Sequence, residues 1–226
     1  MARLLPARLH GRRDPPRPFA AQAIVLRATA IPALVAAALL VLALVAVLWT
    51  SGYVTGMATW LIVPLGACIL ACLVWSANAD GWRIAALRLP VAASARSMSV
   101  WCLGLLALVV AAATVFAQVS RGSGVPAMFA VLLFATGAMT LAVSLALATR
   151  CGTGAALGVT LVVLVFSLVF GSTWIAETNA WIAGVYGWPL TASSDPTRTA
   201  IALTISVVVT CVALAAWLRA IRRAAT

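Results

Sequence analysis

Charged residues are scarce in this chain, and lysine is missing altogether. Of the 226 residues 8% are charged, against about 25% in a soluble domain, and only four are acidic. Without lysine there can be no G-x-x-x-x-G-K-[ST] nucleotide-binding loop. The sequence also lacks H-E-x-x-H and G-x-S-x-G, the motifs of many zinc proteases and serine hydrolases. We therefore expect the chain not to be an enzyme, and any ATP it depends on must be hydrolysed elsewhere.

Apolar residues are abundant instead, at 65% of the chain, with a mean hydropathy of +1.13. No residue is charged between Arg27 and Asp80, nor between Arg96 and Arg121. An uncharged apolar run of about 20 residues is long enough to cross the hydrocarbon core of a bilayer as a helix. The chain is therefore predicted to be an all-α membrane protein.

Six such runs divide the sequence. Residues 1–18, rich in arginine and proline, are predicted to be a disordered cytoplasmic tail, and residues 19–226 one six-span domain. Phe19–Thr29 is predicted to be an interfacial helix, because the apolar stretch that starts there is too long for a single crossing. A turn is predicted at 50–56. The predicted spans are 31–49, 59–76, 100–119, 126–148, 154–174 and 199–218.

All fifteen basic residues are arginine, and their distribution predicts the orientation. Thirteen fall on one side of the predicted membrane, whereas Arg121 and Arg198 fall on the other. Cytoplasmic segments carry the excess of positive charge, so both termini are predicted to be cytoplasmic. All-arginine usage with abundant alanine, valine and leucine is typical of high-GC bacteria, which places this multi-pass protein in a bacterial cell membrane. Since topology accounts for the charge, no nucleic-acid partner is expected.

The five cysteines do not predict a metal site. Cys68 and Cys72 stand four residues apart on one helix face, as a soft-metal pair would. No second ligand pair is present, and the one histidine, His10, lies in the N-terminal tail. We predict no metal and no cofactor on this chain.

Small residues recur at four-residue spacing in the fifth span. Gly154 and Gly158 form a GxxxG pair, and Ser167 and Gly171 continue with the same spacing. Such residues let helix backbones approach closely, so this face serves either internal packing or contact with another subunit.

The hydroxyls of the spans could line a pathway or bond their own helix backbone. They are Thr140, Ser144, Thr160 and Ser167.

The loop between the fifth and sixth spans is too apolar to be fully solvated. Residues 175–198 contain Trp181, Tyr186 and Trp188 with few charges. This composition predicts one or two short helices, broken at Gly184, Gly187 and Pro189, that turn back as a re-entrant outer hairpin. Re-entrant backbone is stable where protein covers it or where it lines a cavity.

The longest polar interruption, Asn78–Ser99, follows the second span. Between Trp82 and Leu89 apolar residues recur at helical spacing, with two arginines off that face, and Pro90 ends the predicted helix. Such a helix either lies on the membrane or is presented to a cytoplasmic partner.

This layout resembles the membrane subunit of ABC-2-type bacterial exporters, including the haem-exporter-B-like branch. The motif is Asp80-Gly81, the apolar run Ile84–Leu87 and then Leu89-Pro90. The resemblance covers nearly the whole chain in layout, although only Asp80 remains of the family's acidic stretch. It implies a coupling helix that docks on a separate ATPase subunit. The implied docking residues are Gly81, Trp82, Arg83, Ile84, Leu87, Arg88, Leu89 and Pro90.

The resemblance also implies the partners. ATP and Mg²⁺ would be bound by the ATPase subunit, and a second permease copy or paralogue would pair with this chain around the substrate path. The uncharged spans favour an apolar or amphipathic cargo, because charged residues inside spans usually mark ion pathways. Two alternatives stay open: a ligand-binding membrane component of a multi-subunit importer, and an accessory or immunity membrane protein.

Overall fold

The computed structural model of the chain describes residues 18–79, 91–120, 125–171 and 177–225. Within these ranges the structure is helical and contains no strand. Six helices are long and apolar enough to cross a membrane, which confirms the predicted number of spans. They are Ile31–Leu48, Ser51–Ala79, Ala92–Val119, Ala127–Cys151, Thr153–Phe170 and Pro196–Arg223.

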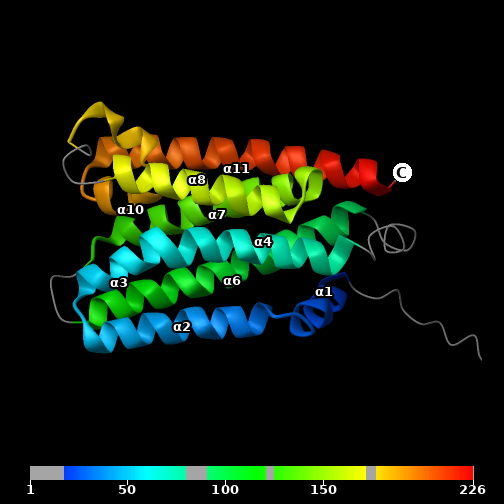
Figure 1. Cartoon of the computed structure of the whole chain (residues 1–226), viewed down its shortest axis with the longest axis horizontal. Coiled ribbons are helices and arrows are strands. Elements are labelled where there is room, and N and C mark those ends of the chain that lie inside the picture. The colour runs from blue at the N-terminus through cyan, green and yellow to red at the C-terminus, as the bar shows by residue number, and fades with distance from the viewer. Residues whose placement is uncertain (1–17, 80–90, 121–124, 172–176, 226) are drawn as a thin grey trace, which may run out of the picture.

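The helices form one elongated bundle (Figure 1). α1 and the C-terminus lie at one end, and α3 and α10 lie at the other. In chain order the elements are α1 (Pro18–Arg27), α2 (Ile31–Leu48), α3 (Ser51–Met57), the π-helical turn η1 (Ala58–Ile62), α4 (Val63–Ala79), α6 (Val91–Val119), α7 (Ala127–Cys151), α8 (Thr153–Phe170), η2 (Asn179–Ala183), η3 (Val185–Gly187), α10 (Trp188–Thr191) and α11 (Pro196–Ala225).

The turn predicted at 50–56 is wrong. α3, η1 and α4 continue into one another as a helical run from Ser51 to Ala79. Glycine, serine and threonine suggested a turn, but the Thr55 hydroxyl donates to the Ser51 carbonyl at 3.1 Å and so stays within the helix. Within a bilayer, backbone N–H and C=O groups must be paired inside the protein, and a helix pairs them within itself. Turn propensities derived from proteins in water do not include this requirement.

α7 lies at the centre of the packing and contacts α4, α6, α8 and α11. Gly137 permits this close approach. A Cβ there would lie 2.8 Å from Val63 Cγ1 and 3.0 Å from Leu106 Cδ1, which come from α4 and α6. Small residues at helix crossings are the usual way for membrane helices to pack without a hydrophobic driving force.

The peripheral helices α2, α8 and α11 present apolar side chains to the outside. Val47, Val165 and Val212 are 82%, 60% and 65% exposed, one on each of these helices. An apolar surface of this extent requires lipid or a protein partner to cover it. The exposure pattern agrees with a membrane-spanning bundle.

The end of the bundle that holds α1 and the C-terminus (Figure 1) carries most of the described arginines, and we call it the arginine-rich end. There Arg150 Nη2 donates to the Ala216 carbonyl at 3.1 Å, joining the end of α7 to α11. α1 is fastened to α6 at this end, since the Phe19 and Trp101 rings stack with centroids 4.8 Å apart. The arginines placed there are Arg27, Arg96, Arg150, Arg219, Arg222 and Arg223.

Candidate functional site

The docking segment expected from the sequence, Gly81–Pro90, lies outside the described residues, as does the basic tail before Pro18. Its implied residues Gly81, Trp82, Arg83, Ile84, Leu87, Arg88, Leu89 and Pro90 share that status. The flanking helices are described. α4 ends at Ala79 and α6 begins at Val91, both at the arginine-rich end.

At the opposite end, residues 179–191 fold onto the bundle as the short helices η2, η3 and α10, and we call them the cap segment. Its three aromatic residues named above are buried: Trp181 and Tyr186 are each 5% exposed and Trp188 is 1% exposed. The two indoles meet edge to face with centroids 6.4 Å apart. The break between η2 and η3 falls at Gly184, whereas the predicted break at Pro189 is wrong, because this proline occupies the first turn of α10.

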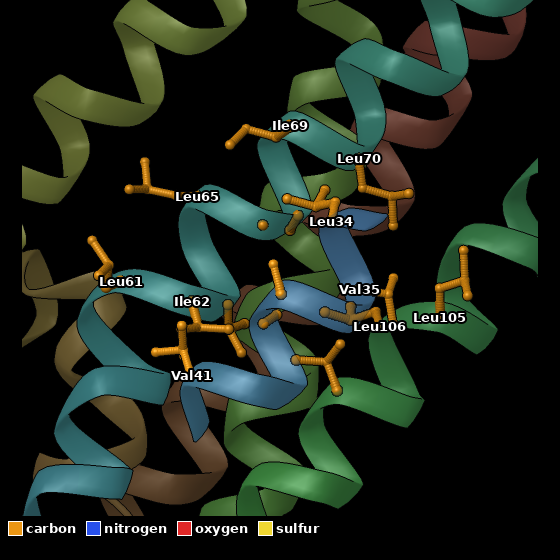
Figure 2. A pocket seen from close by; sticks show the side chains of 16 residues that line it. Leu34, Val35, Val41, Leu61, Ile62, Leu65, Ile69, Leu70, Leu105 and Leu106 are labelled. Carbon is orange, nitrogen blue, oxygen red and sulfur yellow. The ribbon is translucent and has the colours of Figure 1, made fainter. Parts of the chain in front are cut away.

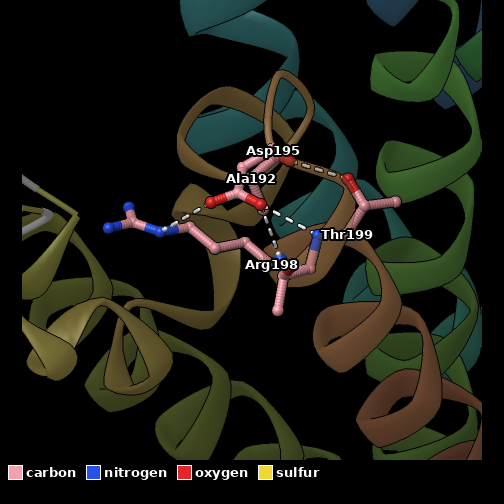
Figure 3. A network of polar contacts seen from close by, with 5 residues as sticks. Ala192, Asp195, Arg198 and Thr199 are labelled. Carbon is pink, nitrogen blue, oxygen red and sulfur yellow. Dashed lines mark hydrogen bonds and ion pairs between the residues drawn. The ribbon is translucent and has the colours of Figure 1, made fainter.

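Asp195 stands between the cap segment and the last span and bonds to the first turn of that span (Figure 3). Its Oδ1 accepts hydrogen bonds from the backbone N–H groups of Thr197 at 2.8 Å and Arg198 at 3.3 Å, so it caps the N-terminus of α11. Oδ2 lies 3.6 Å from Arg198 Nε. The Arg198 guanidinium also lies over the Trp181 ring, 5.3 Å from its centroid. The Thr199 hydroxyl adds a bond of 2.7 Å to the Ala192 carbonyl.

Asp195→Ala is expected to lower the free energy of unfolding by about 1 kcal/mol, the usual cost of a lost N-cap. Thermal unfolding of the purified chain in detergent measures the change. Asp195→Asn is the matched control, because an amide oxygen still accepts from the backbone N–H groups. Equal losses for the two variants would show that charge, and not capping, explains the effect.

The small residues of α8 separate into two pairs on opposite sides of the helix. Ser167 lies nine residues after Gly158, which corresponds to two and a half turns at 3.6 residues per turn, so the two pairs point in opposite directions. Ser167 is fully buried, and its Oγ accepts from the Tyr186 backbone N–H at 3.3 Å. Gly171 lies against the Trp60 ring. Gly154 and Gly158 have no described atom within 4 Å of the Cβ position and remain open.

Gly154 and Gly158 together therefore provide a test of subunit pairing. If a second copy packs on this open face, replacing both glycines with leucine will shift the protein from dimer to monomer, because backbone approach is lost. Chemical cross-linking in native membranes measures the shift. Gly104→Leu on α6 is the control, since Gly104 is equally open. An unchanged dimer fraction in the double variant would place the pairing surface elsewhere.

Beneath the cap segment lies a cavity of about 240 Å³ between α7, α8 and α11. Its polar lining comes from α7, α8 and the cap segment, and consists of Thr140, Ser144, Thr160, Tyr186 and Trp188. Burial raises the pKa of the Tyr186 hydroxyl, while the neighbouring Thr140 and Thr160 hydroxyls act in the opposite direction. The phenol is therefore neutral at physiological pH.

The hydroxyl groups within the spans differ in their hydrogen-bond partners. Thr140 bonds its own helix, donating to the Thr136 carbonyl at 2.9 Å. Ser167 contacts the cap segment instead, and Ser144 Oγ is buried with no hydrogen-bond partner among the described residues. Helix propensity could not distinguish these cases, because each depends on which neighbouring helix faces the hydroxyl.

A second hollow, of about 250 Å³, lies between α2, α4 and α6 (Figure 2). Every side chain that lines it is aliphatic, and Leu34, Leu70 and Leu106 mark its three walls. With no polar group to contact, this groove suits a hydrocarbon chain.

The chain matches no protein-family model, no curated protein and no solved structure. The functional proposal therefore rests on the residues and on the geometry described above.

Proposed function

We propose that the chain is the membrane subunit of an ATP-driven exporter of the ABC-2 type and forms part of the path of an apolar or amphipathic cargo. The observation that carries the proposal is the order of elements around the six spans. A short helix, α1, is fastened to α6 before the first span, and the cap segment packs into the far end between the fifth and sixth spans. This is the layout that the sequence resemblance implies.

In this proposal the arginine-rich end is cytoplasmic, in accordance with the positive-inside rule. α1 then lies at the inner interface of a bacterial cell membrane, and the cap segment is a re-entrant hairpin at the outer face. In the chain the segment Gly81–Pro90 links α4 to α6, whose ends on either side of it lie at the arginine-rich end. An ATPase subunit would dock on it and supply the ATP and Mg²⁺ chemistry for which this chain has no motif.

The interior of the spans supports an apolar cargo. Within the six candidate spans the charged residues are confined to their ends, as with Arg96 and Arg150, while the groove between α2, α4 and α6 is wholly aliphatic. A charged cargo would lose its hydration there without compensation. A second copy or a paralogue would complete the path, and the open face at Gly154 and Gly158 is available to it.

The decisive experiment replaces Gly81–Pro90 with a glycine–serine linker of equal length. The chain is co-expressed with any P-loop ATPase found encoded beside its gene, and we expect the replacement to abolish both co-purification and ATP-dependent transport. A glycine–serine replacement of residues 121–124, which link α6 to α7 in the chain, is the control. The exporter proposal is lost if association and transport survive the first replacement, or if no such ATPase associates with the native chain.

A further inference from the structure

The cavity beneath the cap segment opens sideways. α8 and α11 both pack on α7, but they contact each other little. The cavity lies in this gap and is lined on its other sides by the cap segment and by α7. Val159 of α8 lines the cavity and is 43% exposed on the outer surface of the bundle. A molecule dissolved in the bilayer can therefore reach the cavity laterally, between α8 and α11.

Two lining residues carry polar atoms whose hydrogen bonds are not satisfied. Ser144 and Trp188 are each 1% exposed, and neither Ser144 Oγ nor Trp188 Nε1 has a hydrogen-bond partner in the described part of the chain. An unpaired buried polar group costs free energy, so two of them beside one cavity call for an explanation. A serine hydroxyl can turn between staggered positions and reach a ligand that occupies the cavity. Trp188 supplies a donor only, so the ligand must offer an acceptor.

The lining also limits the charge and size of the ligand. None of the lining residues is acidic or basic, so a charged group would be desolvated without a counter-ion. The remaining walls are apolar, from residues such as Val143, Val163 and Val209. An apolar cavity of about 150 Å³ accommodates benzene, so the 240 Å³ found here accommodates a somewhat larger molecule.

We propose that this cavity is a binding site for a neutral, mainly apolar molecule from the bilayer that is held through one hydroxyl or carbonyl oxygen by Trp188 and Ser144. Binding is a property of the chain alone. Only its interpretation as cargo binding rests on the proposed function, so the site can be tested without an ATPase.

The test uses photolabelling of the purified full chain in lipid nanodiscs. The probe is an eight-carbon alcohol that carries a diazirine, and a diazirine alkane of equal length is the comparison probe. Peptide mapping by mass spectrometry is expected to find the alcohol attached within residues 139–144 and 185–188, and excess octanol is expected to displace it. The alkane should label these residues far less.

Variants distinguish binding through a hydrogen bond from binding by apolar contact alone. Ser144→Ala is expected to reduce labelling by the alcohol about fivefold, which corresponds to one lost hydrogen bond. Ser206→Ala is the matched control, because Ser206 is also 1% exposed and its Oγ has no partner in the described ranges, but it does not line the cavity. Val163→Phe fills the cavity and should block labelling. This variant tests the site independently if Ser144→Ala does not fold.

The site is rejected if alcohol and alkane label the cavity equally, if the folded Ser144→Ala variant is labelled like the native chain, or if Val163→Phe leaves labelling unchanged. Loss of ATPase association in the docking experiment would not alter these outcomes. The two proposals can therefore fail independently.

Discussion

Gly184→Ala is expected to destabilise the chain by about 1–3 kcal/mol, the usual cost of overpacking a well-packed site. A Cβ at this position would lie 2.9 Å from the backbone nitrogen of Gly171 and 3.0 Å from the carbonyl carbon of Phe170. Both atoms belong to the backbone at the end of α8, so no side-chain rotation can relieve the contact. The cap segment must then move away from α8, which weakens the burial of its aromatic residues.

The change is measured as the free energy of unfolding in mixed detergent micelles, followed by tryptophan fluorescence. Gly158→Ala is the matched control. It adds the same methyl group at an open position of α8, so it should be neutral or slightly stabilising, because alanine favours the helix more than glycine does. Similar losses for both variants would show that the close approach of the cap segment to α8 is not what stabilises this end.

Trp188→Ala is expected to have the largest effect on stability, a loss of about 3–5 kcal/mol. Trp188 is among the largest fully buried side chains and forms the edge-to-face contact with Trp181. Its removal would enlarge the neighbouring cavity and leave the cap segment without its central anchor. The same unfolding measurement applies, and limited proteolysis would show the cap segment becoming accessible.

Trp188→Phe distinguishes packing from hydrogen bonding. The phenyl ring keeps most of the packing, while the indole N–H that it removes has no partner among the described residues. We therefore expect a loss well below that of alanine in the ligand-free chain. A loss as large as that of Trp188→Ala would mean that the N–H group, and not the ring, stabilises the cap segment.

The number and approximate position of the spans followed from the sequence because the bilayer imposes a local rule. Each crossing segment must satisfy its own backbone hydrogen bonds, so length and hydropathy suffice to identify it. At residues 50–56 the turn predicted from residue preferences in water was wrong. The glycines and hydroxyls that favour a turn in water are accommodated in the helix Ser51–Met57.

The sequence predicted some features of the candidate sites and not others. The aromatic residues of the loop after the fifth span predicted segments that would not be solvated, and Trp181, Tyr186 and Trp188 are indeed buried. The sequence did not predict which surface would cover them. No signal in the sequence indicated that the Ser144 hydroxyl would lack a partner among the described residues, since a serine within a helix normally bonds to its own backbone.

Sequence alone therefore determined that the chain has six helices long and apolar enough to cross a membrane, with charged residues confined to the helix ends, and that the aromatic residues of the loop after the fifth are buried. Each of these properties is the sum of local contributions from neighbouring residues. Tertiary structure decided that the pairs Gly154–Gly158 and Ser167–Gly171 face opposite sides of α8, and that α7, α8, α11 and the cap segment line one cavity. These depend on the rotation and separation of helices distant in sequence, which close packing of side chains sets and hydropathy does not encode.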